Sequence, residues 1–139
     1  MKLVRRFGPG GAAPSWVDEL DRTCFGETWS ALEEREVLWV LEPHAAARWA
    51  LISSSGEAEL LRIAVDPNCW HTGLGRELLR ACMQALGAEG YRTLHLEVRV
   101  SNVAARALYE SEGWRCTGVR KAYYKDGEDA AVYVKDITG

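Results

Sequence analysis

The sequence predicts a fold of the mixed α/β class, and two features of its apolar pattern carry this prediction. Strand-like runs occupy both halves of the chain, whereas the residues after Gly73 repeat at helical spacing. A strictly alternating run follows that helix, and such a strand, helix, strand unit favours a parallel pair with a right-handed crossover. The 139 residues, 47% of them hydrophobic, suffice for one core, so we expect a single domain over residues 1–139.

The N-terminal segment predicts one short strand and two short helices. Residues 2–7 (KLVRRF) are typical of a strand, and the glycine- and proline-rich stretch behind them indicates a loop. Ser15 with Asp18, and Ser30 with Glu33, have the capping-box spacing, in which a hydroxyl caps helix amides and an acid reaches back. We therefore expect helices at these two serines.

Three strands follow, and they can form a meander. A polar turn around Pro43 and His44 joins the first two strands. The three runs are EVLWVLEP (36–43), ARWALISS (47–54) and EAELLRIAV (57–65).

The next two elements complete the strand, helix, strand unit. Apolar residues recur at helical spacing at Leu74, Leu78, Ala81, Cys82 and Ala85, before Gly87 and Gly90 close the segment. Residues 92–100 then alternate, so that one face of the strand carries Leu94, Leu96, Val98 and Val100 and the other carries Thr93, His95, Glu97 and Arg99.

The C-terminal segment predicts one more helix and two strands. Ser101 or Asn102 can cap the helix, and Gly113 can end it in the left-handed conformation. The two strands surround residues 125–129 (KDGED), in which Asp126-Gly127 is typical of a hairpin turn.

Charge and composition exclude several classes of function. The net charge is -3 with no block of lysines or arginines, which argues against nucleic acid as a partner and favours a basic peptide. No run has the length of a signal peptide or a membrane span, so we expect a cytoplasmic protein. The four cysteines contain no C-x-x-C pair and the three histidines are scattered, so we expect reduced thiols and no metal site.

The stretch HTGLGRELL (71–79) lies at the predicted start of the central helix and indicates an anion site. A glycine-rich turn there exposes main-chain amides, and the helix dipole adds partial positive charge, which suits phosphate. A nucleotide P-loop would need a lysine after Gly75, which is absent. A dinucleotide fingerprint is met by Gly73, Gly75 and Glu97 but lacks its third glycine, at Leu78, and remains an alternative.

The loop and its flanks resemble the GNAT superfamily of acetyl-CoA-dependent N-acetyltransferases, and within it the ribosomal-protein-alanine N-acetyltransferases. The pattern [QR]-x-x-G-x-[GA] reads His71-Thr72-Gly73-Leu74-Gly75-Arg76 here, with histidine in its first position. The resemblance is close over residues 57–135, including LLRIAVDP before the loop and TLHLEVRVSNVAARALYESEGW after it. Earlier residues match only in element order, although CFGETWS (24–30) resembles a family loop that usually contains proline.

This resemblance implies the GNAT fold and a set of cofactor-binding residues. The fold would be a twisted, mostly antiparallel sheet of about six to seven strands, with one parallel unit at the cofactor site and about four helices. Main-chain groups of Ile63, Ala64 and Val65 would bind the pantetheine arm of acetyl-CoA, and His71, Thr72, Gly73, Leu74, Gly75 and Arg76 would bind its pyrophosphate. Asn102 would contact the cofactor as well, unless its main task is to cap the helix.

The resemblance also implies the two catalytic residues. Glu97 would accept a proton from the attacking amine, directly or through a water, and Tyr109 would be the proton donor to the leaving thiolate. A neutral α-amine is easier to obtain than a neutral lysine, since their pKa values of about 8 and 10.4 correspond to roughly 1.4 and 4.6 kcal/mol at pH 7. Cys69 also lies near the loop, but the sequence places no histidine and acid to activate it, so we expect direct transfer in a ternary complex.

The implied acceptor is the N-terminal alanine of a small-subunit ribosomal protein. The acceptor groove would bring Trp29, Tyr123 and Tyr124 near the site. The enzyme would act as a monomer or weak dimer, without metal. Two alternatives stay open: an acetyltransferase acting on lysine or a small amine, and a non-catalytic acyl-CoA sensor.

Overall fold

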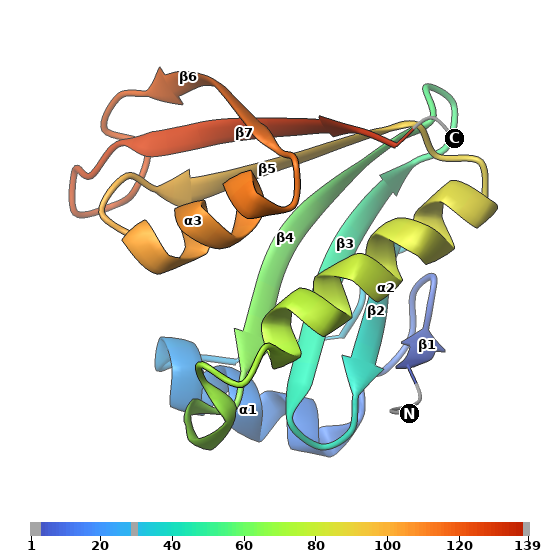
Figure 1. Cartoon of the computed structure of the whole chain (residues 1–139). Coiled ribbons are helices and arrows are strands. Elements are labelled where there is room, and N and C mark those ends of the chain that lie inside the picture. The colour runs from blue at the N-terminus through green and yellow to red at the C-terminus, as the bar shows by residue number, and fades with distance from the viewer. Residues whose placement is uncertain (1–3, 29–30, 138–139) are drawn as a thin grey trace.

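Seven strands form one sheet in the order β1-β2-β3-β4-β5-β7-β6 in the computed structural model, which describes residues 4–28 and 31–137 (Figure 1). Every neighbouring pair is antiparallel except β4 and β5, which are parallel. The predicted mixed α/β class with one parallel unit is therefore confirmed. The strands are β1 Val4–Phe7, β2 Glu36–Leu41, β3 Ala45–Ile52, β4 Glu57–Val65, β5 Thr93–Arg99, β6 Arg115–Arg120 and β7 Ala130–Asp136.

The described residues contain three α-helices, one fewer than expected: α1 (Ser15–Phe25), α2 (Leu74–Ala88) and α3 (Val103–Ser111). A short 3-10 helix, η1, spans Pro67–Cys69 and precedes the glycine-rich loop. The missing helix is the one expected from the second capping box.

The capping box at Ser15 does not form as predicted, and residues 31–35 do not form the helix expected after Ser30. The cap of α1 is Pro14, whose extended backbone (φ -58°, ψ 144°) precedes Ser15 and makes no side-chain cap, so Ser15 is the first helical residue. Ser30 lies outside the described residues. After it, Leu32 bridges to the N-terminal loop through a 2.8 Å bond from its N–H to the Gly11 carbonyl, and no helix forms.

The core lies on both faces of the sheet. α1 covers one face, where Val17 and Leu20 pack with Leu38, Val40 and Ala46. On the other face, α2 packs across β2, β3 and β4 (Figure 1). Its buried side chains there are Leu74, Leu78, Leu79, Cys82 and Leu86.

Two small residues of β3 let helices approach the sheet from both sides. Ala46 belongs to the cluster under α1, and Ala47 belongs to the cluster under α2. Because both faces are covered, β2 is buried along its whole length and shows no polar alternation.

The predicted hairpin turn at Asp126-Gly127 is wrong in length. β6 ends at Arg120 and β7 begins at Ala130, so residues 121–129 form a longer loop. Aspartate side chains stabilise it, since Asp129 accepts from the Ala122 N–H at 2.8 Å and Asp126 accepts from the Glu128 N–H at 3.0 Å. The loop carries Tyr123 and Tyr124, whose rings pack together on the side of the sheet where β4 and β5 diverge.

A bulge in β4 opens the sheet next to the parallel pair. Opposite β3, Arg48 pairs with Arg62 but Trp49 pairs with Leu60, so Leu61 is an extra residue that bends β4. β4 pairs with β5 only up to Leu60 and Leu96. Beyond this point the two strands diverge, as Figure 1 shows, with β4 following β3 and β5 following β7.

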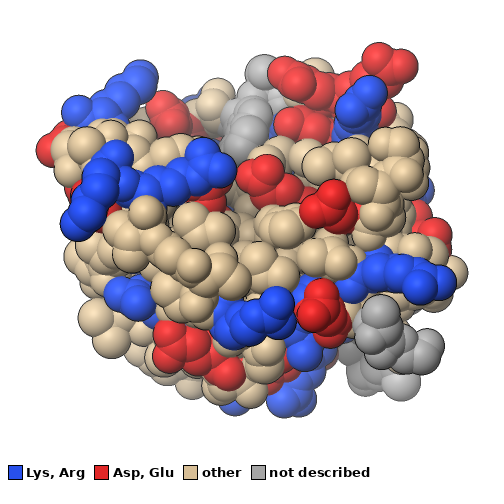
Figure 2. All heavy atoms as spheres, turned by 90° about the horizontal axis from the view of Figure 1, so that it is seen from above, with Lys and Arg blue, Asp and Glu red and all other residues tan. Residues whose placement is uncertain are grey.

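The surface carries charges of both signs. Figure 2, seen from above the view of Figure 1, shows basic and acidic side chains intermixed without a broad area of one sign. Among the described residues, no helix has both the length and the apolar character needed to cross a bilayer.

Candidate functional site

The divergence of β4 and β5 forms a cleft of about 590 Å³. One wall is β4 from Leu60 to Ile63, and the opposite wall is β5 together with one side of α3. Phe25 and Glu27, at and just after the C-terminal end of α1, and Tyr124 from the loop after β6 complete the lining. The residues that line it are Phe25, Glu27, Leu60, Leu61, Arg62, Ile63, Leu96, Glu97, Val98, Arg99, Asn102, Ala105, Tyr109 and Tyr124.

Glu97 reaches the cleft from the polar face of β5. Its neighbours Leu96 and Val98 point into the core below α2 and α3, so Glu97 points to the opposite face of the sheet. Its side chain is only 17% exposed, and the Arg120 Nε lies 3.1 Å from its Oε2. That contact lacks hydrogen-bond geometry, and Glu97 Oε2 has no hydrogen-bond partner within the described part of the chain. A buried acceptor of this kind is suited to take a proton from a ligand.

Glu97 interacts electrostatically with Glu59 and Tyr123 as well as with Arg120. Burial, followed by the charge of Glu97, raises the pKa of Glu59 above its ordinary value. The charge of Glu97 is also the main cause that raises the pKa of Tyr123. The polar side of the cleft therefore carries two neighbouring carboxyls, Glu59 and Glu97, with Arg120 paired to the second.

Tyr109 reaches the cleft from α3, on the core side of the sheet. Its ring packs against Trp114 and Tyr133, with centroids 5.9 and 6.2 Å away. The residue is 4% exposed, and burial raises the pKa of its hydroxyl far above the ordinary value. The phenol therefore stays protonated at neutral pH and can donate a hydrogen bond.

The structure brings Glu97 and Tyr109 to one cleft from opposite faces of the sheet. In a continuous sheet these side chains would be separated by the backbone. Here the gap between β4 and β5 joins the two sides, so both groups line the same space.

The open edge of β4 offers main-chain groups at Ile63 and Val65 but not at Ala64. The Asp66 N–H bonds the His44 carbonyl at 2.7 Å, so the residues of β4 bonded to β3 are the even-numbered ones at this end. Ala64 therefore bonds to β3, and its side chain packs under α1. The N–H and C=O groups of Ile63 and Val65 point to the cleft side. The Val65 carbonyl already accepts hydrogen bonds there, from Trp70 Nε1 at 2.8 Å and from the Cys24 thiol at 3.3 Å.

The glycine-rich loop leaves the start of α2 without a side-chain cap. Gly73 is the cap residue, with φ 84°, and makes no side-chain bond to the helix amides. The first N–H groups of a helix, here from Leu74 to Arg76, have no acceptors inside the helix. His71 also has a positive φ of 64°, and such turns direct successive N–H groups to one side. The loop therefore has the uncapped helix start that an anion site would need, and anion binding there stays a prediction.

Two further residues fix the loop. A Cβ at Gly75 would lie 3.4 Å from the Val65 side chain, so glycine lets α2 begin close to the end of β4. The Thr72 hydroxyl bonds the Cys69 carbonyl, which ties the loop to η1.

The side chain of Arg76 points away from this anion site. It donates to Ser111 at 2.9 Å and lies 3.4 Å from Glu112 at the end of α3. Arg80, one turn later, binds Glu112 in two bonds and lowers the pKa of its carboxyl. Arg76 can thus bind an anion through its main-chain amide, while its side chain links α2 to the end of α3.

Asn102 has the capping role that was one of its two predicted tasks. Its side-chain oxygen accepts from the Ala105 N–H at 3.1 Å and starts α3. The residue also lines the cleft, which leaves its side-chain amide available to a ligand.

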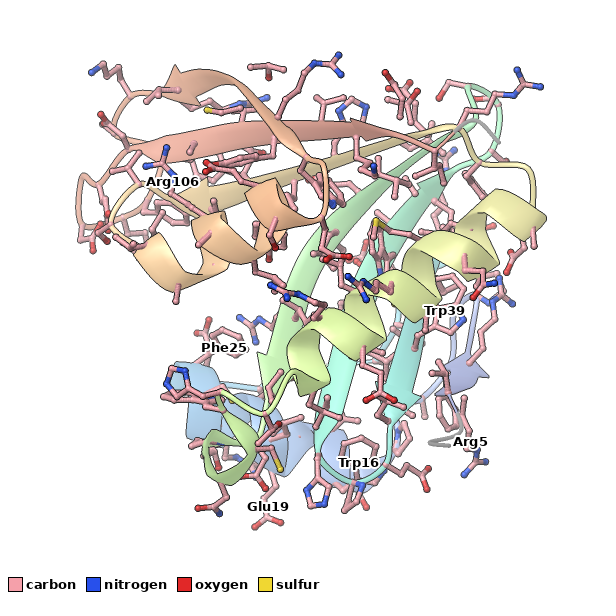
Figure 3. The ribbon with its side chains drawn as sticks, viewed as in Figure 1. Arg5, Trp16, Glu19, Phe25, Trp39 and Arg106 are labelled. Carbon is pink, nitrogen blue, oxygen red and sulfur yellow. The ribbon has the colours of Figure 1, made fainter. Side chains whose placement is uncertain are left out.

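Aromatic residues border the entrance. Tyr124 lines the cleft with the Arg99 guanidinium 4.1 Å from its ring centre, and Tyr123 packs edge-on against it. Phe25 extends from the end of α1 toward the cleft (Figure 3), under the guanidinium of Arg62 at 4.1 Å. Trp29, expected here as well, lies outside the described residues.

Sequence reasoning missed two features. The bulge at Leu61 has no local signal, because bulges follow from strand pairing rather than from residue type. A cluster of His44, Asp66 and Cys69 was missed too, since residues scattered in the sequence meet only in the folded chain. His44 and Asp66 thus lie close to Cys69, and the expectation that its thiol is not activated stays a prediction.

A mostly antiparallel sheet opened at one parallel pair, with an uncapped glycine-rich helix start at the end of the opening, is the architecture of acyl-CoA-dependent acetyltransferases. The comparison with family models agrees: residues 12–114 match the Acetyltransferase (GNAT) family. The chain belongs to this family, whose members use acetyl-CoA.

Comparisons with individual proteins show similarity to a narrower group within this family. The chain is 49% identical over 78 residues to the [ribosomal protein bS18]-alanine N-acetyltransferase of Escherichia coli K12, covering 55% of this chain and 53% of that protein. It thus spans about half the length of the curated relatives it matches. The crystal structure of the Escherichia coli ribosomal-protein-S18-alanine N-acetyltransferase has a TM-score of 0.78 at 30% identity, over 99% of this chain and 96% of that one. An acetyl-CoA-bound GNAT acetyltransferase from Elizabethkingia anophelis, 17% identical with a TM-score of 0.75 over 96% and 97% of the two chains, shares the fold.

The histidine in the loop gives a testable expectation for cofactor affinity. His71→Arg should tighten acetyl-CoA binding by about fivefold at low salt, because one exposed charge pair contributes up to about 1 kcal/mol. Isothermal titration at two salt concentrations measures this gain, which should shrink as salt rises. Gln84→Arg, an exposed position further along α2, adds the same charge away from the loop and is the matched control. Equal gains in both variants, or no gain at residue 71, would contradict this role of the loop.

Proposed function

We propose that the chain transfers an acetyl group from acetyl-CoA to the N-terminal α-amino group of a protein, by direct attack in a ternary complex. The observation that carries this proposal is the presence of Glu97 and Tyr109 on opposite sides of one cleft. A sensor of acyl-CoA would have no use for a proton acceptor facing a hydrogen-bond donor, so catalysis is the better interpretation.

The residues present fit acetyl-CoA. The amides from Leu74 to Arg76 at the start of α2 would hold the diphosphate, since helix N-termini bind phosphate groups. Ile63 and Val65 would bond the pantetheine amides as an added strand on the open edge of β4. This placement directs the thioester into the cleft between β4 and β5.

Glu97 and Tyr109 act at different steps of the proposed reaction. Glu97 takes the proton that the amine loses as its nitrogen attacks the thioester carbonyl carbon and a tetrahedral intermediate forms. When the intermediate collapses, the carbon–sulfur bond breaks and the thiolate leaves. Tyr109 donates a hydrogen bond to that sulfur, and because burial raises its pKa we assign it charge stabilisation rather than complete proton transfer.

An α-amine is the preferred nucleophile for a site with one carboxylate. Deprotonating it at pH 7 costs roughly 1.4 kcal/mol, against roughly 4.6 for lysine. The acidic surroundings of Glu97 and Glu59 suit a cationic amine and a basic chain behind it.

The named relatives favour the N-terminal alanine of a small-subunit ribosomal protein as the acceptor. Such a client would place the reaction in the cytoplasm, and we propose that the chain acts there as a monomer or weak dimer. Lysine or a small amine is the alternative acceptor, because the cleft is open to solvent.

Acetyl-CoA turnover against a peptide panel tests this proposal. Peptides that begin with alanine should be acetylated faster than those that begin with bulky residues, and a blocked peptide with internal lysines should not react. Mass spectrometry of the products locates the acetyl group. Turnover restricted to the blocked peptide would contradict the α-amine assignment, and absence of turnover with any acceptor would favour a sensor.

Substitution of the two catalytic residues tests the mechanism. Glu97→Gln and Tyr109→Phe should each lower kcat at least tenfold with little change in acetyl-CoA affinity, since both groups act mainly in the transition state. Glu128→Gln, a carboxylate paired with Arg99 outside the cleft lining, is the matched control and should retain turnover. Unchanged kcat in both cleft variants would remove them from the reaction.

A further inference from the structure

We propose that His44, Asp66 and Cys69 form a binding site for one zinc-type divalent ion. One ring nitrogen of His44, one carboxylate oxygen of Asp66 and the sulfur of Cys69 all lie within 4.8 Å of one another. The His44 Nδ1 and Asp66 Oδ2 are 3.6 Å apart. Ligands around tetrahedral zinc at bonds of about 2.0–2.3 Å are separated by about 3.3–3.7 Å. The His44–Asp66 pair already has this separation, and the sulfur, within 4.8 Å of both, needs to move by roughly 1 Å at most to reach it.

Main-chain bonds hold the three residues together. The Asp66 N–H donates to the His44 carbonyl at 2.7 Å, and the Cys69 N–H donates to the Asp66 carbonyl at 2.8 Å. The second carboxylate oxygen, Asp66 Oδ1, accepts from the Asn68 N–H at 3.0 Å, which leaves Oδ2 facing His44. The ligand set is thus fixed by the turn between β2 and β3, the end of β4 and η1.

The donor atoms select the kind of metal. A set of nitrogen, oxygen and sulfur suits zinc, whereas magnesium and calcium prefer oxygen alone. Three protein ligands leave a fourth position for water, and the 46% exposed side chain of His44 gives an ion access from solvent. Binding would release the thiol proton of Cys69, because the thiolate is the ligand.

A catalytic cysteine relay is the competing use of these residues. Such a relay needs a histidine between thiol and acid, with a different ring nitrogen toward each. Here a single ring nitrogen lies near both partners, which is the convergence that a metal requires. Cys69 is also absent from the lining of the acetyl-transfer cleft.

The metal would stabilise the entry to the glycine-rich loop. Cys69 lies two residues before His71, and its carbonyl accepts the Thr72 hydroxyl. An ion bound to Cys69 and His44 would clamp this segment to the sheet. The site does not depend on the proposed acetyl transfer, so its test can fail or succeed separately.

Cobalt(II) is the probe for the site, because it replaces zinc and reports its ligands in the visible and near-ultraviolet spectrum. The full chain, purified with reductant and freed of metal by chelation, should show one equivalent of cobalt with a thiolate charge-transfer band. Zinc should displace it, and zinc should raise the midpoint of thermal unfolding.

Variants decide whether these three residues are the ligands. Cys69→Ser should abolish the charge-transfer band, and His44→Gln should weaken cobalt binding at least tenfold. Cys116→Ser, at an exposed cysteine on β6, is the matched control and should leave the band unchanged. A band absent from the native chain, a band retained in Cys69→Ser, or one lost in Cys116→Ser would each overturn the proposal. Acetylation of Cys69 after incubation with acetyl-CoA would also overturn it, in favour of the relay.

Discussion

The site depends on one irregularity, the extra residue Leu61 in β4. It bends the strand away from β5 after only four paired positions, Glu57 to Leu60, and leaves the main-chain groups of Ile63 and the N–H of Val65 without a neighbouring strand. Unpaired groups at a sheet interior are costly unless water or a ligand bonds them. A ligand that carries amide groups can bond these main-chain groups in the manner of an added strand. The irregular pairing of β4 therefore leaves a strand edge at which such a ligand can bind.

The same opening explains how the side chains of Glu97 and Tyr109 come to line one cleft. Glu97 belongs to the polar face of β5, and Tyr109 belongs to a helix on the opposite face. In an intact sheet the backbone would separate the two side chains. The glycine-rich start of α2 lies at the end of β4, beside Val65. One bend therefore brings together an uncapped helix start, an open strand edge, a buried carboxylate and a buried phenol.

Much of this could be predicted from sequence, and the failures have physical causes. Periodicity predicted the strands and the helix from Leu74, and the spacing of Gly73 and Gly75 predicted a glycine turn at the start of that helix, because these signals are local. The cap expected at Ser15 failed because Pro14 takes that position, and the short hairpin at Asp126 failed because aspartate side chains stabilise a longer loop. The bulge at Leu61 and the meeting of His44 with Cys69 arise from tertiary pairing, which spacing along the chain does not encode.

Backbone NMR of the amides during an acetyl-CoA titration tests the central claim most directly. The account predicts large shifts and slowed hydrogen exchange at Ile63, Val65 and the first amides of α2, with little change in exchange at Arg62 and Ala64, which already bond to β3. Equal effects at odd and even positions of β4, or effects confined to residues outside the cleft and the loop, would contradict it.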